Sequence, residues 1–139
     1  MKPIVASLLV AAGIAGPLVS HLAAQTNREV AYVPFAFVAG NQKMPAGRYV
    51  VDEAAAGSPL FRLTDDRRHT IFVPFSRAVR GNPERPSLTF ACYGKECILA
   101  KVTPPVSMSA YELSQQSIDK KISHKVGVVS MIAIRLTDH

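Results

Sequence analysis

The stretch that decides the fold is SLTFACYGKECILAKV, residues 87–102. Two runs of β-favouring residues, Ser87 to Tyr93 and Glu96 to Val102, flank the pair Gly94-Lys95. A glycine-first pair between two such runs suits a two-residue type II′ turn, because glycine adopts the positive φ of the first turn position without a steric cost. The stretch therefore predicts a β-hairpin.

Similar short runs recur along the chain and are separated by Gly, Pro, Asn and Asp. We expect strands at residues 28–38, 48–53, 59–64, 69–73, 87–93, 96–102, 110–115 and 127–136. A spacing of about 8 to 12 residues between strands is typical of an antiparallel sandwich or barrel. The fold prediction is therefore all-β, a single antiparallel sandwich or flattened barrel of about eight strands.

Two of these strands carry a further expectation about their place in a sheet. Pro34 interrupts the run 28–38 and has no N–H to donate, so this strand should lie at an edge or carry a bulge there. The last strand, which includes residues 128–134, is apolar on both faces and carries no charge. We expect it to be buried between neighbouring strands, since an exposed strand of this kind would be prone to aggregation.

One short helix is expected near the C-terminus. The segment from Ser117 to His124 begins with a residue that favours the N-cap position, and Ile118 and Ile122 fall on one helical face. This helix would accompany the strands and would not change the fold class.

The first 24 residues have the layout of a secretory signal peptide. Lys2 precedes an apolar run from Ile4 to Val19, and small residues follow at Ala23 and Ala24. The run falls short of the roughly 20 apolar residues that a spanning helix needs. We expect cleavage after Ala24, so that residues 25–139 form one exported β domain, periplasmic or secreted, with no stable transmembrane span; an uncleaved anchor is the alternative.

The positive charge of the chain is moderate and mostly scattered. The sequence carries 16 Lys and Arg against 10 Asp and Glu, a formal net charge of +6. It contains no nucleic-acid-binding motif, so nucleic acid is not an expected partner. The candidate contacts to an anionic surface, such as lipid headgroups or acidic glycans, are Arg67, Arg68, Arg77, Arg80 and Arg85. The alternative for these residues is an ordinary solvated surface.

Cys92 and Cys97 are the two cysteines of the chain. With a two-residue turn at Gly94-Lys95 they lie opposite each other across the hairpin, within disulfide reach, and an oxidising compartment would join them. A redox-active pair is less favoured, because the C-x4-C spacing lacks the C-x-x-C arrangement that lowers a thiol pKa. A metal site would need His69 and His124, which lack ligand-like spacing, so no metal and no cofactor are expected.

No catalytic signature appears in the sequence. Asp65, Asp66 and His69 could act as acid and base, but Asp-Asp-Arg-Arg is typical of a turn. There is no G-x-S-x-G elbow, no H-E-x-x-H pair and no phosphate-binding glycine loop. We therefore expect a protein that is not an enzyme.

The aromatic residues leave two interpretations open. Alternating aromatic side chains could form a surface that stacks on carbohydrate or holds an apolar ligand, or they could form core and cross-strand pairs. The tyrosines in question are Tyr32, Tyr49, Tyr93 and Tyr111.

Two linked motifs resemble a known family. Residues 33–49 read VPFAFVAGNQKMPAGRY, and residues 88–94 read LTFACYG. The chain is similar to a family of short exported β-rich proteins, abundant in acidobacteria and largely without assigned function, that carry VPFxFxxGxxxxPAGxY and LxFxxYG. The resemblance implies a secreted all-β domain and supplies no catalytic residue. The chain departs from the family pattern at Cys92 and Cys97, and again after Val102.

These features lead to a functional expectation. We expect a non-catalytic exported domain that acts as a binding or structural module of the cell envelope or extracellular space, with a partner there that the sequence does not identify. The alternative is a small β-barrel that carries an apolar ligand, and a hydrolase-type enzyme ranks third.

Overall fold

The computed structural model describes residues 13, 16, 28–55, 57–121 and 129–139. The expected signal peptide and its cut after Ala24 therefore lie outside the described residues, apart from Gly13 and Gly16. Within the described part of the chain, no helix is long and apolar enough to cross a membrane.

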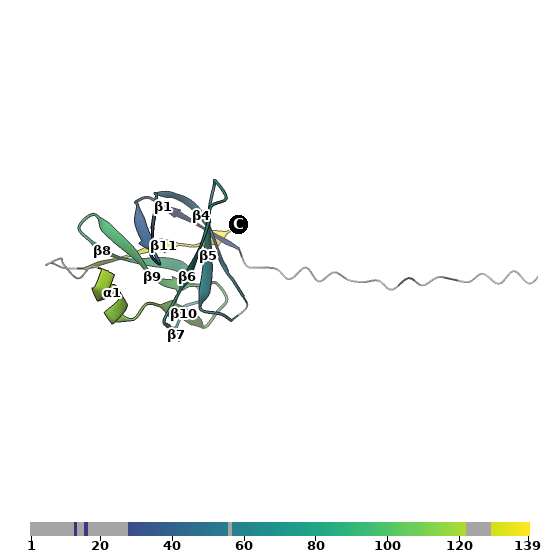
Figure 1. The fold of residues 1–139 in the computed structure, drawn as a ribbon. Helices are drawn as coiled ribbons and strands as arrows, with labels where there is room; N and C mark the ends of the chain where they lie inside the picture. The colour runs from purple at the N-terminus through teal and green to yellow at the C-terminus, as the bar shows by residue number, and fades with distance from the viewer. Residues whose placement is uncertain (1–12, 14–15, 17–27, 56, 122–128) are drawn as a thin grey trace, which may run out of the picture.

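Two β-sheets face each other across one core (Figure 1). The first sheet consists, in spatial order, of β12 (Thr137–Asp138), β1 (Glu29–Val33), β4 (Gly47–Glu53), β5 (Leu60–Asp65) and β6 (Thr70–Pro74). The second consists of β11 (Ser130–Arg135), β8 (Ser87–Tyr93), β9 (Glu96–Thr103), β10 (Ser109–Glu112) and β7 (Arg77–Arg80), with β2 (Phe37–Ala39) beside β9 and β3 (Gln42–Met44) beside β2. The predicted all-β sandwich is confirmed, and over the described residues neither sheet closes into a barrel.

The chain passes from the first sheet to the second at Pro34. β1 ends at Val33 in the first sheet, and β2 begins at Phe37 in the second. Because Pro34 has no N–H, the ladder of β1 cannot continue through it. The prediction of one strand over 28–38 is therefore wrong, and the expected edge or bulge takes the form of a crossing between sheets. The described residues form twelve strands, against about eight expected, in part because one predicted strand is divided in this way.

The β8–β9 hairpin forms as predicted. Tyr93 pairs with Glu96 across the turn, and Gly94 has a φ of +59°. The ladder shifts register between Thr89 and Phe90, so β9 carries one more residue than β8 over this stretch. The hairpin supplies the centre of the second sheet.

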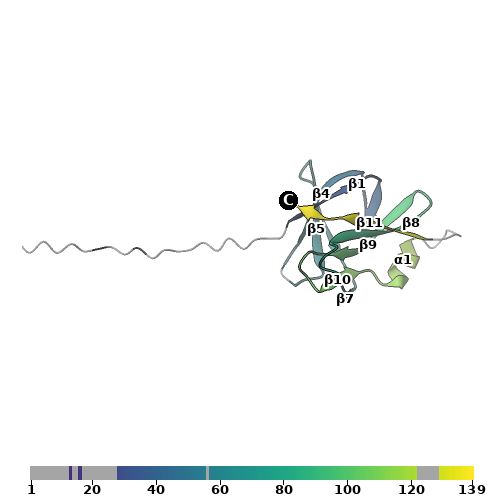
Figure 2. The same ribbon diagram turned by 180° about the vertical axis from the view of Figure 1, so that it is seen from behind.

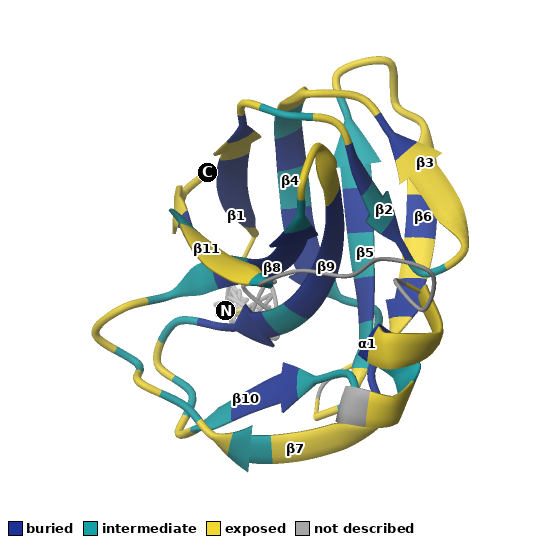
Figure 3. Ribbon diagram, turned by 90° about the vertical axis from the view of Figure 1, so that its left-hand side faces the viewer, coloured by how far each residue is buried: buried dark blue, intermediate teal, exposed yellow. Residues whose placement is uncertain are grey.

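The core lies between the two sheets and is filled by side chains. Its aromatic rings meet edge to face, with centroids 5.1 Å apart for Phe37 and Phe90 and 5.2 Å apart for Phe37 and Tyr49. The largest fully buried side chains are Tyr49, Phe61, Phe90, Leu63, Leu88, Leu99, Val33, Val73 and Val102. Figure 3 shows β8 and β9 largely buried, whereas β7 and β11 are mostly exposed.

The short helix α1 spans Gln115–Lys121 and covers part of the outer face of the second sheet (Figure 2). Its N-cap is Ser114, whose Oγ accepts a hydrogen bond from the Ser117 N–H at 3.1 Å, so the predicted cap at Ser117 is wrong. Ile118 packs with residues of β8 and β9, as its position on one helical face predicts. The rest of the predicted helix, residues 122–124, lies outside the described residues.

The last strand is not buried between neighbours, contrary to prediction. β11 lies at the edge of the second sheet and, among the described strands, pairs with β8 alone. Met131 is 59% exposed. The physical reason is that β9 already has neighbours on both sides, because β8 occupies one and β2 and β10 share the other. β11 therefore pairs on the free side of β8, which places it at an edge of this sheet.

Candidate functional site

The five candidate arginines fall into two groups in the fold. Arg67 and Arg68 lie in the turn between β5 and β6, in the first sheet. Arg77 and Arg80 are the first and last residues of β7 in the second sheet, and Arg85 lies in the loop that follows. The structure therefore brings Arg77, Arg80 and Arg85 into one region and leaves the other two elsewhere.

Arg77 is neutralised by a carboxylate. Its Nε donates a hydrogen bond to Glu112 Oε1 at 2.7 Å, and its Nη2 also bonds Glu112. The two residues are partners in the ladder between β7 and β10. An arginine engaged in this way contributes little net attraction to an external anion, so Arg77 is a weaker candidate than its neighbours.

Arg80 and Arg85 line an open hollow of about 780 Å³ on the outer face of the second sheet. We call it the basic hollow. Its floor consists of Ser87, Thr89, Lys101, Thr103 and Ala133. Its wall consists of Arg80, Gly81, Asn82, Pro83, Arg85 and Met108. The lining thus contains three cationic side chains and three hydroxyls, and none of the lining residues is acidic.

Strand register explains the floor of the basic hollow. Ser87 pairs with Thr103, and Thr89 pairs with both Lys101 and Ala133. Paired residues of neighbouring strands point to the same face of a sheet, so all five side chains share the outer face. Four of the five are short, which leaves space above them.

A glycine allows the wall to lie close to β10. The Gly81 N–H donates to the Met108 carbonyl at 2.8 Å. A Cβ on Gly81 would lie 2.9 Å from Ala110 N, which is backbone and cannot move aside cheaply. Asn82 shapes the rest of the loop, since its Oδ1 accepts from Glu84 N at 3.1 Å and its carbonyl accepts from Arg85 N at 3.1 Å.

Lys101 is a member of the basic hollow that the sequence analysis missed. The predicted hairpin register, without a bulge, pairs Lys101 with Leu88 on the core face. The register shift between Thr89 and Phe90 pairs Lys101 with Thr89 instead and turns it to the outer face, and no signal in the sequence indicated this shift. Two acidic residues occupy neighbouring positions without lining the hollow. Glu112 pairs with Lys101 in the ladder but bonds Arg77, and Glu84 lies in the loop. The local charge of the hollow is therefore positive.

The β5–β6 turn gives Asp65 a structural role. Asp65 Oδ1 accepts hydrogen bonds from the backbone N–H groups of Arg67 at 2.9 Å and His69 at 2.8 Å. Arg68 takes a φ of +63°, a conformation that the turn requires. These contacts agree with the interpretation that Asp65-Asp66-Arg67-Arg68 forms a turn.

Cys92 and Cys97 form the predicted disulfide, with Cα atoms 4.0 Å apart. Both side chains are buried and belong to the main core between the sheets. His69 lies next to the β5–β6 turn of the first sheet, and His124 lies outside the described residues. Over the described part of the chain, no group of three or more His, Cys, Asp and Glu side chains is arranged to hold a metal ion.

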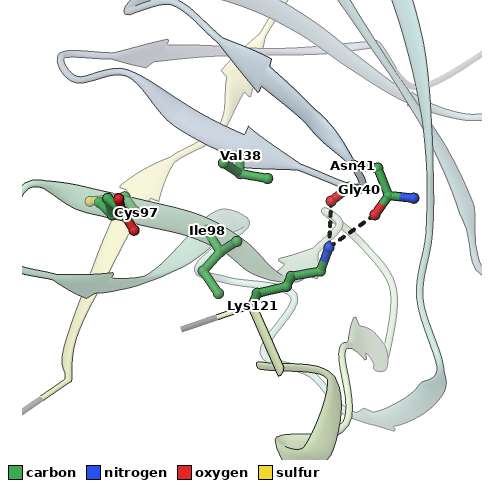
Figure 4. A pocket seen from close by; sticks show the side chains of 7 residues that line it. Val38, Gly40, Asn41, Cys97, Ile98 and Lys121 are labelled. Carbon is green, nitrogen blue, oxygen red and sulfur yellow. Dashed lines mark hydrogen bonds between the residues drawn. The ribbon is translucent and has the colours of Figure 1, made fainter. Parts of the chain in front are cut away.

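A smaller hollow of about 220 Å³ lies beside the second sheet (Figure 4). Val38, Cys97 and Ile98 line its apolar part. Lys121 Nζ donates to the Gly40 carbonyl at 2.5 Å and to Asn41 Oδ1 at 3.3 Å, as the dashed lines in Figure 4 show. This lysine therefore joins the end of α1 to the turn between β2 and β3, which is a structural role.

Comparisons of the chain with protein-family models, with curated proteins and with solved structures found no match. Among the sites described above, the basic hollow has the clearest chemical preference. Its three cations come from β7, from the loop that follows β7 and from β9, and they line the hollow together with hydroxyl groups that can donate further hydrogen bonds. This arrangement suits an oxyanion ligand.

Proposed function

We propose that this protein is an exported, non-catalytic module of the cell envelope or extracellular space that binds an anionic surface or polymer through the basic hollow. The observation that carries the proposal is the convergence of Arg80, Arg85 and Lys101 around a hydroxyl-lined floor without an acidic lining residue. Arginine forks bind carboxylate or phosphate through two parallel hydrogen bonds, and lysine adds a mobile point charge.

The amino-terminal sequence supports the export part of this proposal. Lys2 and the apolar run that follows are typical of a signal peptide, and cleavage after Ala24 would release residues 25–139. The disulfide between Cys92 and Cys97 is compatible with an oxidising compartment. We further propose kinship with the exported β-rich family, whose two motifs fall here on the β1–β2 crossing with the start of β4 and on the β8–β9 hairpin.

Neither of the other functional expectations has a specific observation in its favour. The space between the two sheets is filled by buried side chains such as Phe90 and Leu99, which leaves the carrier alternative without support from the described core. Asp65, the carboxylate considered for catalysis, bonds the backbone of its own turn. The binding proposal is therefore the one that we retain.

The test compares two triple variants of the mature chain that lower the net charge equally. The hollow variant is Arg80→Ser/Arg85→Ser/Lys101→Ser, and the control is Lys43→Ser/Arg67→Ser/Arg68→Ser, whose residues lie outside the basic hollow. Binding is measured to phosphatidylglycerol vesicles and to polygalacturonate, so that lipid phosphate and polymer carboxylate are distinguished.

We expect the hollow variant to lose about tenfold or more in affinity for at least one probe, and the control to change by less than about threefold. Wild-type binding should also weaken as salt is added, because both partners are exposed to solvent. Equal losses in the two variants would mean that binding follows net charge alone. That result, or no binding of the wild type to either probe, would overturn the proposal.

A further inference from the structure

An exposed tyrosine and an arginine lie side by side on the outer face of the first sheet. Tyr32 is 65% exposed, although the other four residues of β1 are buried. Its partner in the ladder between β1 and β4 is Arg48. Facing residues of paired strands have Cβ atoms about 5 Å apart, so the aromatic ring and the guanidinium are neighbours.

Two adjoining hollows meet at Arg48. One, of about 360 Å³, is lined by Tyr32, Val33, Pro34, Ala46, Gly47 and Arg48. The other, of about 280 Å³, is lined by residues 45–49 and 65–67. Ala46, Gly47 and Arg48 belong to both. Because they share these three residues, we treat the two hollows as one candidate site and call it the tyrosine hollow.

Arg48 forms a hydrogen bond with a neighbouring turn. Its Nη1 donates to Asp66 Oδ1 at 3.2 Å. The interaction with Asp66, and after it that with the Tyr32 side chain, raises the pKa of Arg48, so the guanidinium stays charged. A guanidinium has five N–H donors, more than these neighbours require. Arg48 therefore offers further donors next to Tyr32.

The tyrosine hollow differs from the basic hollow in its charge. Its lining contains Arg48 and Arg67 together with Asp65 and Asp66, so cations and carboxylates balance. An anion would gain little here, because the carboxylates oppose it. The site instead offers an exposed ring, planar donors and planar acceptors within one depression.

We propose that the tyrosine hollow binds a neutral oligosaccharide, with one sugar ring stacked on Tyr32 and its hydroxyls hydrogen-bonded by Arg48 and Asp66. A pyranose has an apolar C–H face that fits an aromatic ring, and its hydroxyls are both donors and acceptors around the rim. Such a ligand needs an amphipathic aromatic surface and polar groups of both kinds close to it. This site lies in the other sheet from the basic hollow and shares no lining residue with it.

The experiment is a titration of isotope-labelled mature protein with maltotetraose, cellotetraose and chitotetraose, followed by amide chemical shifts. We expect saturable shifts at Tyr32, Arg48 and Asp66 with at least one sugar, at a Kd below about 10 mM. Tyr32→Ala should abolish saturation. Tyr32→Phe, which keeps the ring, should stay within about fivefold of the wild type, because most of the contact is apolar.

Phe72→Ala is the matched control. Phe72 is 57% exposed on β6 of the same sheet and lines neither part of the tyrosine hollow, so its removal should leave sugar binding unchanged. Asp66→Ala changes an exposed turn residue and should weaken sugar binding at least about threefold. This variant tests the site even if Tyr32→Ala fails to fold.

No saturable shift with any of the three sugars would overturn the inference. Shifts confined to the second sheet, or equal affinities for wild type, Tyr32→Ala and Asp66→Ala, would overturn it as well. The variant Arg80→Ser/Arg85→Ser/Lys101→Ser should bind the sugar as the wild type does. The sugar titration therefore succeeds or fails separately from the test of anion binding.

Discussion

Arg62 forms a bidentate ion pair with Asp52 across strands β4 and β5. Arg62 Nε donates to Asp52 Oδ1 at 3.0 Å, and its Nη2 bonds the other carboxylate oxygen. The Asp52 side chain is only 7% exposed, and Arg28 Nε approaches it to 3.9 Å. The hydrogen bonds from Arg62 to Asp52 raise the pKa of Arg62, so its guanidinium stays charged. It joins two central strands on the outer face of the first sheet.

We expect Asp52→Ala to be more destabilising than Asp66→Ala. The first change leaves the Arg62 guanidinium without its buried partner and should lower the free energy of unfolding by about 2 kcal/mol. The second breaks an exposed pair, between Asp66 and Arg48, and should cost less than about 1 kcal/mol. Urea unfolding followed by far-ultraviolet circular dichroism measures both. Equal losses would contradict the distinction between a buried and an exposed pair.

The disulfide between Cys92 and Cys97 should contribute modestly to stability. It closes a very short loop, and loop-closure entropy grows only with the logarithm of loop length, so Cys92→Ala/Cys97→Ala should cost about 2 kcal/mol in the free energy of unfolding and the domain should stay folded. Reductant should shift the urea midpoint of the wild type in the same direction and leave the double variant unchanged. A reductant effect on the double variant would show that the shift does not come from this bond.

Glu29 should make the stability of the domain fall as pH rises above the ordinary glutamate range. Burial, and after it the neighbouring charge of Asp138, raises the pKa of Glu29 above 4.5. The folded state therefore binds more protons than the unfolded state between that value and the raised one, so stability is lost as pH increases through this window.

Glu29→Gln tests this effect, because the amide cannot ionise. The variant should be more stable than the wild type near neutral pH, and the difference should vanish as pH falls below about 4. Asp138→Asn should reproduce only part of it, since burial is the larger cause. Urea midpoints across this pH range provide the measurement, and a difference that does not change with pH would contradict the assignment to Glu29.

Local pattern predicts those features whose partners lie close in sequence. The register that pairs Cys92 with Cys97 follows from the Gly94-Lys95 turn alone, and Asp65 caps its own hairpin. For Pro34 the sequence predicted an interruption of the ladder but not the crossing to the second sheet. Proline shows that a ladder must stop, but which sheet the chain joins next depends on strands far away in sequence.

The candidate site shows the same limit. Arg80 and Arg85 are visible in a basic loop, but Lys101 joins them only because the register shift between Thr89 and Phe90 turns it to the outer face. Arg77 leaves the set because of Glu112, 35 residues away in the sequence. Charge density along a chain thus identifies candidates, whereas contacts with residues distant in sequence decide which of them already form an ion pair.

Among the described strands, β11 has a partner on one side only, and its other edge should promote self-association that one lysine can suppress. Met131 is 59% exposed on an edge strand whose next residues, Ile132, Ala133 and Ile134, are also apolar. Natural sheets block edge-to-edge pairing with charged side chains, lysine above all. We expect Met131→Lys to lower concentration-dependent association in light scattering and to leave the urea midpoint nearly unchanged.

Val106→Lys is the matched control for this effect, because it adds the same charge at an exposed apolar residue outside any strand. Val106 is 84% exposed in the turn before β10. A general effect of charge would make both variants equally less prone to associate, whereas an edge effect would be confined to Met131→Lys. If the wild type remains monomeric at all concentrations, the apolar side chains of β11 do not support pairing between copies, and the strand is already protected.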